Sequence, residues 1–275
     1  MKNESRFLLI NANNTNTSFA LANQRRVSRV VKVPTAAVRK IPFSPRQYDG
    51  VVLASVVPTA TKRLLRLLRV AQASRLRVAR KGSTASRDAC ATKPILVDAS
   101  IDLGIGVDYP HKKQIGADRL ANAVGVAKLY GAPAIVVDFG TALTFDIVKP
   151  STSLRSGARA AYVGGVIAPG LAAVTDYLYQ RTALLPRIKI EEPRRGGIIG
   201  KSTVAAMRAG AVVGYRGLVK EILQALRRER GLRNAVVVAT GGYAHLMAKQ
   251  IPEIRHVNPL LTLEGLRLIA LRNFK

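Results

Sequence analysis

The sequence predicts an α/β fold made of two copies of one strand–turn–strand unit. Segments with strand and helix patterns alternate along the chain. In addition, "LLINANNTNTSFAL" (8–21) and "IVVDFGTALTFDIV" (135–148) share an apolar strand, a tight turn and a second strand, so that Asn11 aligns with Asp138. A chain of 275 residues with 48% hydrophobic content can bury one large core or two moderate ones. We therefore expect a duplicated domain, with two unrelated hairpins as the alternative.

Each expected element follows from its own apolar pattern. Short apolar runs bounded by turn residues predict strands at 7–11, 18–21, 50–55, 95–97, 134–138, 143–148, 162–167 and 235–239. Apolar residues spaced three and four apart predict helices at 60–73, 117–130, 171–181, 203–230 and 263–273. The stretch 74–93 is rich in Arg, Ser and Ala without a clear period, so we expect an irregular connection there.

The chain is strongly basic, with 44 Lys and Arg against 16 Asp and Glu, a net charge of +28. Such a field attracts polyanions and also small anions such as nucleotides. Between Lys62 and Lys93 there are ten basic residues and one acid, Asp88, but no aromatic residue on which a base could stack. Two explanations stay open: a nucleic-acid partner, or a solvated basic face that reflects a general bias toward arginine.

Composition also bears on compartment and metals. No segment approaches the roughly 18 to 20 apolar residues of a membrane span, and the N-terminus lacks a signal-peptide pattern. We therefore expect a soluble, cytoplasmic protein without a membrane partner. The single cysteine, Cys90, cannot form an internal disulfide, and the three histidines lack metal-ligand spacing. A structural metal site is not expected.

The turn between the first two strands is unusually rich in Asn and Thr. Asparagine tolerates the positive φ of a hairpin turn, so a merely decorated hairpin is one interpretation. The other is a phosphate-binding loop, because two such hairpins facing each other across a cleft can hold the β- and γ-phosphates of a nucleotide. A carboxylate at the strand end would then serve a cation. The internal repeat favours the phosphate interpretation.

Three further motifs are consistent with the phosphate-binding interpretation. The segment 114–131 enters a helix with Asp118 and Arg119 side by side in the first turn. The helix dipole alone favours an acid there, but an acid and an arginine could also bind an anionic alcohol and accept its proton. "GGVIAPG" (164–170) and "VVVATGG" (236–242) each carry a strand into a glycine turn, where a ligand can approach the backbone.

These motifs, in this order, resemble the type III pantothenate kinase family of the actin-like, sugar-kinase and Hsp70 ATPase superfamily. The resemblance reaches from about Leu8 to Leu271. The matching segments are the first hairpin, "SVVP" (55–58), "YPHKKQIGADR" (109–119), "VVDFGTALTFD" (136–146), "GGVIAPG", "RTALLP" (181–186), "IGKSTVAAMRAGAVVGYRG" (199–217), "TGG" (240–242) and "LEGLRLIAL" (263–271).

The resemblance implies a fold and an activity. The fold would be two actin-like (ribonuclease H-like) ATPase domains, residues 1–130 and 131–275, with the active site in the cleft between them. The activity would be transfer of the γ-phosphoryl group of ATP to the 4′-hydroxyl group of pantothenate, the first step of coenzyme A synthesis. Magnesium with the ATP, a monovalent cation (K⁺ or NH₄⁺) and a homodimer are implied as well.

The resemblance also implies roles for individual residues. Asp118 would be the catalytic base. The pantothenate pocket would comprise Tyr109, Gly116, Ala117, Asp118, Arg119 and Thr203. Asp138 would bind the monovalent cation. ATP would be held by Asn11, Ala12, Asn13, Asn14, Thr15, Asn16, Thr17 and Thr141.

One departure from the family pattern concerns the first hairpin. The family's Asp-x-Gly-Asn-Thr is Asn-Ala-Asn-Asn-Thr here, so Asn11 replaces the carboxylate and Asn13 the glycine. Asn13 can still adopt a left-handed turn, whereas Asn11 lacks the negative charge that would hold magnesium. Two alternatives therefore remain: a degenerate homologue with a regulatory or nucleic-acid-binding role, and a related kinase for another hydroxylated acid or a sugar.

Overall fold

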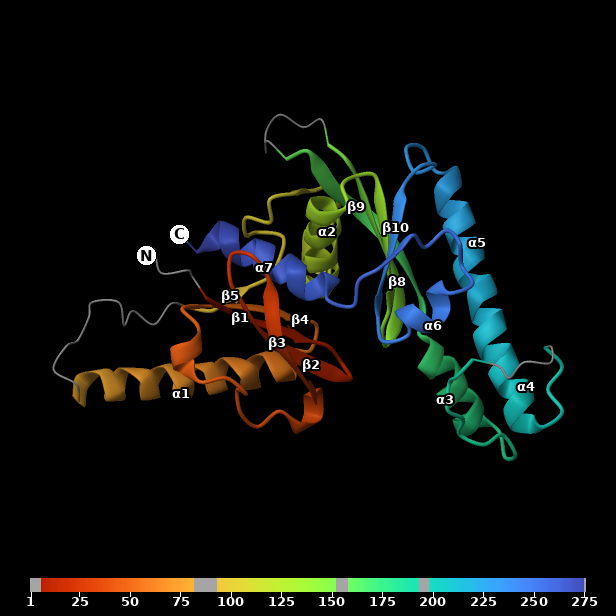
Figure 1. Cartoon of the computed structure of the whole chain (residues 1–275), viewed down its shortest axis with the longest axis horizontal. Helices are drawn as coiled ribbons and strands as arrows, with labels where there is room; N and C mark the ends of the chain where they lie inside the picture. The colour runs from red at the N-terminus through yellow and green to blue at the C-terminus, as the bar shows by residue number, and fades with distance from the viewer. Residues whose placement is uncertain (1–5, 82–92, 152–157, 193–197, 275) are drawn as a thin grey trace. The chain divides into compact units, whose positions relative to one another are not determined.

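A computed structural model describes residues 6–81, 93–151, 158–192 and 198–274, with the backbone alone for 72–81 (Figure 1). The chain divides into two compact units. Unit 1 comprises Met1–Gly125 and Leu260–Lys275, and unit 2 comprises Val126–Pro259. Each unit contains a β-sheet with helices packed against it.

Unit 1 contains most of the N-terminal elements and the last helix. They are β1 (Phe7–Ala12), β2 (Asn16–Ala22), β3 (Val27–Pro34), η1 (Thr35–Ala37), η2 (Pro45–Gln47), β4 (Gly50–Ser55), α1 (Pro58–Lys81), β5 (Ile95–Leu96), β6 (Gly106–Val107), η3 (Lys112–Gln114) and α7 (Leu261–Asn273). Helix α2 (Ala117–Leu129) begins in this unit and crosses the boundary.

Unit 2 contains the second sheet and its helices. They are β7 (Ala134–Phe139), β8 (Ala142–Pro150), β9 (Ala160–Pro169), α3 (Leu171–Arg181), α4 (Thr203–Ala209), the π-helical turn η4 (Gly210–Gly214), α5 (Tyr215–Arg228), β10 (Val236–Gly241), α6 (Ala244–Ala248) and β11 (His256–Val257).

Five strands in each of the two sheets follow one topology. The strand order is β3-β2-β1-β4-β5 in unit 1, and β9-β8-β7-β10-β11 in unit 2. In each, the first three strands in this order are antiparallel neighbours and the last three are parallel neighbours. Asn11 pairs with Ser18 on one side, as Asp138 pairs with Thr144. The predicted α/β class and the predicted duplication are confirmed.

Each sheet is buried because helices cover it. In unit 1, Leu8 and Ile10 of β1 form one core with Leu64 and Leu68 of α1. The neighbouring residues of β1 are buried as well, which is typical of a central strand covered on both faces. In unit 2, β7 and β8 pack against α5 and α6 through a second apolar core.

The C-terminal helix corrects the predicted division of the chain. Residues 131–275 were expected to form one domain, but α7 packs on β1 and β4 of unit 1. The Phe274 ring stacks on Phe7 with 5.7 Å between ring centroids. Gly265 of α7 lies against α2, and Thr262 donates a hydrogen bond to Asn122 at 2.7 Å. Because α7 covers the first sheet, it belongs to unit 1 although it lies at the end of the sequence.

Three other expectations differ from the structure. Helix α1 continues to Lys81, so the irregular connection expected from residue 74 is wrong for 74–81, and 82–92 lie outside the described residues. The helix predicted at 203–230 is interrupted by the π-turn η4, which begins and ends at glycine. Strand β3 (VSRVVKVP) was missed because its valines neither form a continuous run nor alternate strictly with polar residues; half of its residues are exposed, as is usual for an edge strand.

Candidate functional site

The β1–β2 hairpin is closed at its tip and braced from β3. The Asn13 amide donates to the Asn16 carbonyl oxygen at 3.0 Å. Thr35, the first residue of η1 directly after β3, donates its amide to the Thr15 carbonyl at 3.0 Å and its hydroxyl to the Asn13 carbonyl at 2.6 Å. The buried hydroxyl of Thr17 lies 3.0 Å from that of Thr35. Thr35, which the sequence did not single out, therefore holds the turn in shape.

The hairpin presents both exposed groups and unsatisfied oxygens. Asn14 and Thr15 are exposed at the tip. Asn11 is only 9% exposed. Within the described part of the chain, its Oδ1 atom has no hydrogen-bond partner, and the buried Oδ1 atom of Asn13 has none either. Buried side-chain oxygens usually have a donor or a cation beside them. This pair of oxygens therefore fits a site that is completed by a ligand.

Asp118 lies close to the end of this hairpin. The Val56 amide, just after β4, donates to the Ala12 carbonyl at 3.2 Å. A Cβ atom on Gly116 would lie 3.3 Å from Val56 and 2.7 Å from Oδ1 of Asp118. Gly116 therefore allows the carboxylate to approach the β4 loop, and the contacts link Asp118 to the strand that carries the hairpin.

The carboxylate of Asp118 has its orientation and acidity set locally. Its Oδ1 atom accepts a hydrogen bond from the backbone amide of Arg119 at 2.9 Å. Burial raises the pKa of Asp118 above the usual value for an aspartate, and the amide and charge of Arg119 offset part of that rise. A carboxylate with a raised pKa is a better proton acceptor than an ordinary aspartate.

The β7–β8 hairpin in unit 2 has the same design with a shorter turn. The Gly140 amide donates to the Ala142 carbonyl at 3.1 Å, one residue nearer than in the first hairpin. Thr141 is exposed at the tip. Asp138, on β7, pairs with Thr144 on β8 and with Thr240 on β10.

Two glycines from distant segments close around this hairpin. Gly241, at φ +90°, lies so near Asp138 that a Cβ atom there would be 2.6 Å from Oδ1 of the carboxylate. A Cβ atom on Gly170 would be 2.0 Å from the Thr141 carbonyl oxygen. The glycine motifs noted in the sequence thus meet at Asp138 and Thr141. Their close approach to these residues appeared only in the structure.

The structure also gives the positions of three other predicted site residues. Ala117 is buried at the start of α2, and Tyr109 is half-buried between β6 and η3. Thr203 is exposed as the first residue of α4, after Ser202, whose hydroxyl accepts from the Ala205 amide at 3.2 Å.

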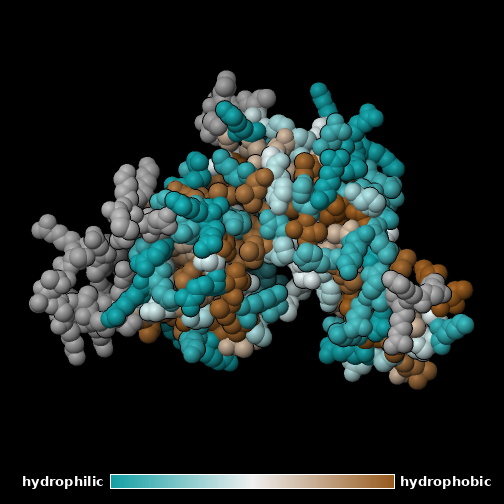
Figure 2. Space-filling model, viewed as in Figure 1, coloured by the Kyte–Doolittle hydropathy of each residue, from teal (hydrophilic) through white to brown (hydrophobic). Residues whose placement is uncertain are grey.

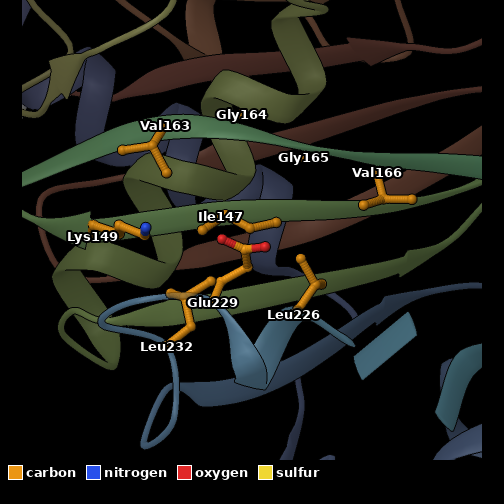
Figure 3. Close-up of a pocket in the computed structure, with 9 residues that line it drawn as sticks. All are labelled: Ile147, Lys149, Val163, Gly164, Gly165, Val166, Leu226, Glu229 and Leu232. Atoms are coloured by element: carbon orange, nitrogen blue, oxygen red, sulfur yellow. The ribbon is translucent and has the colours of Figure 1, made fainter. Parts of the chain in front are cut away.

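A small pocket lies elsewhere in unit 2 (Figure 3). It has a volume of about 150 Å³ and lies between β8, β9 and the end of α5. Gly164 and Gly165 leave the space, and the carboxylate of Glu229 and the ammonium of Lys149 are its charged groups. Since none of the predicted site residues lines it, this pocket is separate from both hairpins.

Two further observations concern metals and membranes. Over the ranges given above, no three His, Cys, Asp or Glu side chains gather closely enough to hold a metal ion by themselves. Hard cations also accept amide, carbonyl and phosphate oxygens, so a cation that a bound nucleotide helps to hold does not need three such side chains. Among the described helices, none is both long and apolar enough to cross a bilayer.

Comparison with known proteins gives consistent matches. The family model described as type III pantothenate kinase matches residues 7–225. Two proteins named type III pantothenate kinase are similar over nearly the whole chain. The Akkermansia muciniphila protein is 46% identical over 270 residues, which cover 96% of this chain and 98% of the relative. The Acidiphilium cryptum protein is 38% identical over 280 residues, with 97% and 94% coverage.

A solved structure agrees in fold. It is a Campylobacter jejuni protein described as a conserved candidate transcriptional activator of the Baf family. The TM-score is 0.52 at 16% identity, and the match covers 97% of this chain and 98% of the other. At this identity the similarity concerns the fold alone.

Proposed function

Because the chain belongs to the type III pantothenate kinase family, we propose that it transfers the γ-phosphoryl group of ATP to the 4′-hydroxyl group of pantothenate, the first step of coenzyme A synthesis. The observation that carries this proposal is the position of Asp118 beside the end of the β1–β2 hairpin. The family match over most of the chain favours this activity over a degenerate regulatory homologue or a kinase for another acid.

Asp118 acts as the base. The pantothenate hydroxyl oxygen attacks the γ-phosphorus, the bond to the β,γ-bridging oxygen breaks, and the hydroxyl proton passes to the Asp118 carboxylate. The products are ADP and 4′-phosphopantothenate. Phosphoryl transfer depends mainly on positioning and on neutralising charge, so the fixed orientation of Asp118 by the Arg119 amide is important.

Pantothenate is an anion, and the guanidinium of Arg119, next to Asp118, suits its carboxylate. Arg119 offers a planar fork for a carboxylate, and Gly116 and Ala117 leave room for substrate beside it. Tyr109, half-buried, and Thr203, exposed, complete the proposed set of substrate contacts.

The phosphates of ATP are held at the hairpin tips. Asn14 and Thr15 in the first hairpin and Thr141 in the second are exposed at the tips of their hairpins, where phosphate oxygens would bind. The side chains of Ala12 and Thr17 are buried, so these two contribute through the backbone and through the brace to Thr35. Asn16, the first residue of β2, closes the turn through its carbonyl oxygen, which accepts a hydrogen bond from the Asn13 amide.

Two cations support the reaction. Asp138 would bind the monovalent cation with nearby backbone oxygens. Magnesium would be held mainly by the ATP phosphates, with the Oδ1 atom of Asn11 as the protein-side oxygen. When bound, these ions neutralise the charge that the phosphoryl group carries during transfer.

Turnover of the purified protein tests the proposed function. ADP release should require pantothenate and should be faster in potassium or ammonium than in sodium. Release that is independent of pantothenate, or absent from folded protein under every salt condition, would contradict the proposal.

Replacing Asn11 by Asp should lower the Mg²⁺ concentration that turnover requires. The new carboxylate adds a charged oxygen where Asn11 has an unpartnered one, so half-maximal turnover should require several-fold less Mg²⁺. Binding of Mn²⁺ in the presence of ADP, followed by electron paramagnetic resonance, gives a readout independent of turnover. Asn23→Asp, at the other end of β2, makes the same charge change and should alter neither measurement. Equal curves for Asn11→Asp and the unmodified protein would remove Asn11 from the cation site.

We also propose a homodimer. Exposed apolar side chains gather on α3 and near α4, which Figure 2 shows as a brown area at that end of unit 2. They include Val174, Tyr177, Leu184, Ile198, Ile199 and Val204. Contiguous exposed apolar surface of this kind marks a protein interface, and a second copy of the chain is the occupant that the family resemblance implies.

Ile199→Asp should convert the dimer to a monomer in sedimentation velocity, because Ile199 is 85% exposed and a carboxylate there would be buried unpaired in the interface. Leu129→Asp, at an exposed apolar position at the end of α2, is the matched control and should remain dimeric. A monomeric unmodified protein at micromolar concentration would refute the homodimer.

A further inference from the structure

Helix α1 and the loops beside it form a surface of one charge. The guanidinium of Arg63 donates to the carbonyls of Thr35 and Ala36, and Arg39 donates to the same Ala36 carbonyl at 2.7 Å. Helix α1 also packs against η2. These contacts bring exposed cations of three segments together, and we call this set the α1 basic face: Arg39, Lys40, Arg46, Lys62, Arg66 and Arg69.

Among the residues that the structure describes, no acid neutralises this face. Asp49 is the only acidic residue between Arg6 and Lys81, and it pairs with Arg6 at 3.2 Å. Within the described ranges, none of the six cations forms an ion pair. Like charges held close together on a rigid element cost free energy, so a bound anion would stabilise the arrangement.

The geometry of the face matches a phosphate backbone. Lys62, Arg66 and Arg69 are four and three residues apart, so they follow one side of α1 with about 5–6 Å between neighbouring Cβ atoms. Several point charges in a row suit a polyanion better than a single small anion. A row of this kind contacts phosphates without reading base edges.

Two alternative polyanions fit less well. A membrane-binding basic helix inserts its apolar side into lipid, but here Leu64 and Leu68 are fully buried against the sheet. Single-stranded nucleic acid is normally bound with aromatic stacking, and the nearby Phe43 and Tyr48 are buried. A duplex requires neither feature.

We propose that the α1 basic face binds the phosphate backbone of double-stranded nucleic acid without sequence preference. This binding is a second property of the chain, and it does not depend on the kinase residues, none of which belongs to the face. Binding of nucleic acid would also account for part of the chain's net charge of +28.

The test compares two triple variants with the same charge change. Lys62→Gln/Arg66→Gln/Arg69→Gln alters the α1 basic face. Arg228→Gln/Arg230→Gln/Arg233→Gln alters exposed cations at and beyond the end of α5 in unit 2. A fluorescein-labelled DNA duplex of mixed sequence is titrated by anisotropy at several salt concentrations, and pantothenate turnover is measured in parallel.

The α1 variant should bind the duplex about tenfold more weakly or worse, and the slope of log K against log salt should become shallower by about 2.7 for three lost phosphate contacts. The α5 variant should keep the slope, and both should keep normal turnover. Equal losses in both variants would attribute binding to net charge alone. Weak duplex binding together with tight binding to single strands or to phosphatidylglycerol vesicles would also overturn the proposal.

Discussion

Asp118→Asn is expected to lower pantothenate turnover by about 10² to 10⁴ fold, the usual contribution of a positioned general base. Asparagine keeps the shape of the side chain and can still accept the hydrogen bond from the Arg119 amide, so the start of α2 should stay intact. It cannot take a proton. The measurement is ADP release at saturating ATP and pantothenate, with thermal unfolding to verify the fold.

The pH profile gives this prediction a second readout. Burial raises the pKa of Asp118, so the protonated, inactive form persists to a higher pH than for an ordinary aspartate. Turnover of the unmodified enzyme should therefore rise with pH as Asp118 loses its proton, with a midpoint above the usual aspartate range. The residual turnover of Asp118→Asn should lack this rise.

Glu221→Gln is the control for loss of a carboxylate. Glu221 is exposed on α5, and its replacement should leave both rate and pH profile unchanged. If Asp118→Asn retained more than about a tenth of the turnover, the general-base role would be wrong and Asp118 would be limited to the helix-dipole role that any first-turn acid can play.

Gly265→Ala is expected to destabilise unit 1 by about 3 kcal/mol or more. A Cβ atom on Gly265 would lie 1.9 Å from the Ala121 carbonyl oxygen, a distance that no side-chain rotation can relieve. Helices α7 and α2 would have to separate, which would disturb the bond between Thr262 and Asn122 at 2.7 Å. Urea denaturation followed by circular dichroism measures the change in the free energy of unfolding.

Gly217→Ala makes the same substitution in a helix where an added Cβ atom meets nothing within 4 Å. Alanine has the higher helix propensity, so this variant should be more stable by about 0.5–1 kcal/mol. If both variants had the same stability, the close packing of α7 on α2 would be refuted. A loss confined to Gly265→Ala would support α7 as part of the first unit.

The central strands and most helices could be predicted because their apolar residues follow the period of the element. Strands β1, β4 and β7 are continuous apolar runs, and the expected helix at 171–181 is α3 itself. The last turns of α1 carry charge in place of such a pattern, and the valines of β3 neither form a continuous run nor alternate strictly, so local sequence did not identify either segment.

The sequence by itself determined the two hairpins, their alignment of Asn11 with Asp138, and the helix that begins at Asp118, because each depends on neighbouring residues. Only the tertiary structure decided how distant segments meet. Gly170 lies against Thr141, Gly241 against Asp138, and α7 against the first sheet, although the segments in each contact are far apart in the sequence. Such contacts depend on shape and on which sheet face lacks a cover, and neither is written in a local pattern of residues.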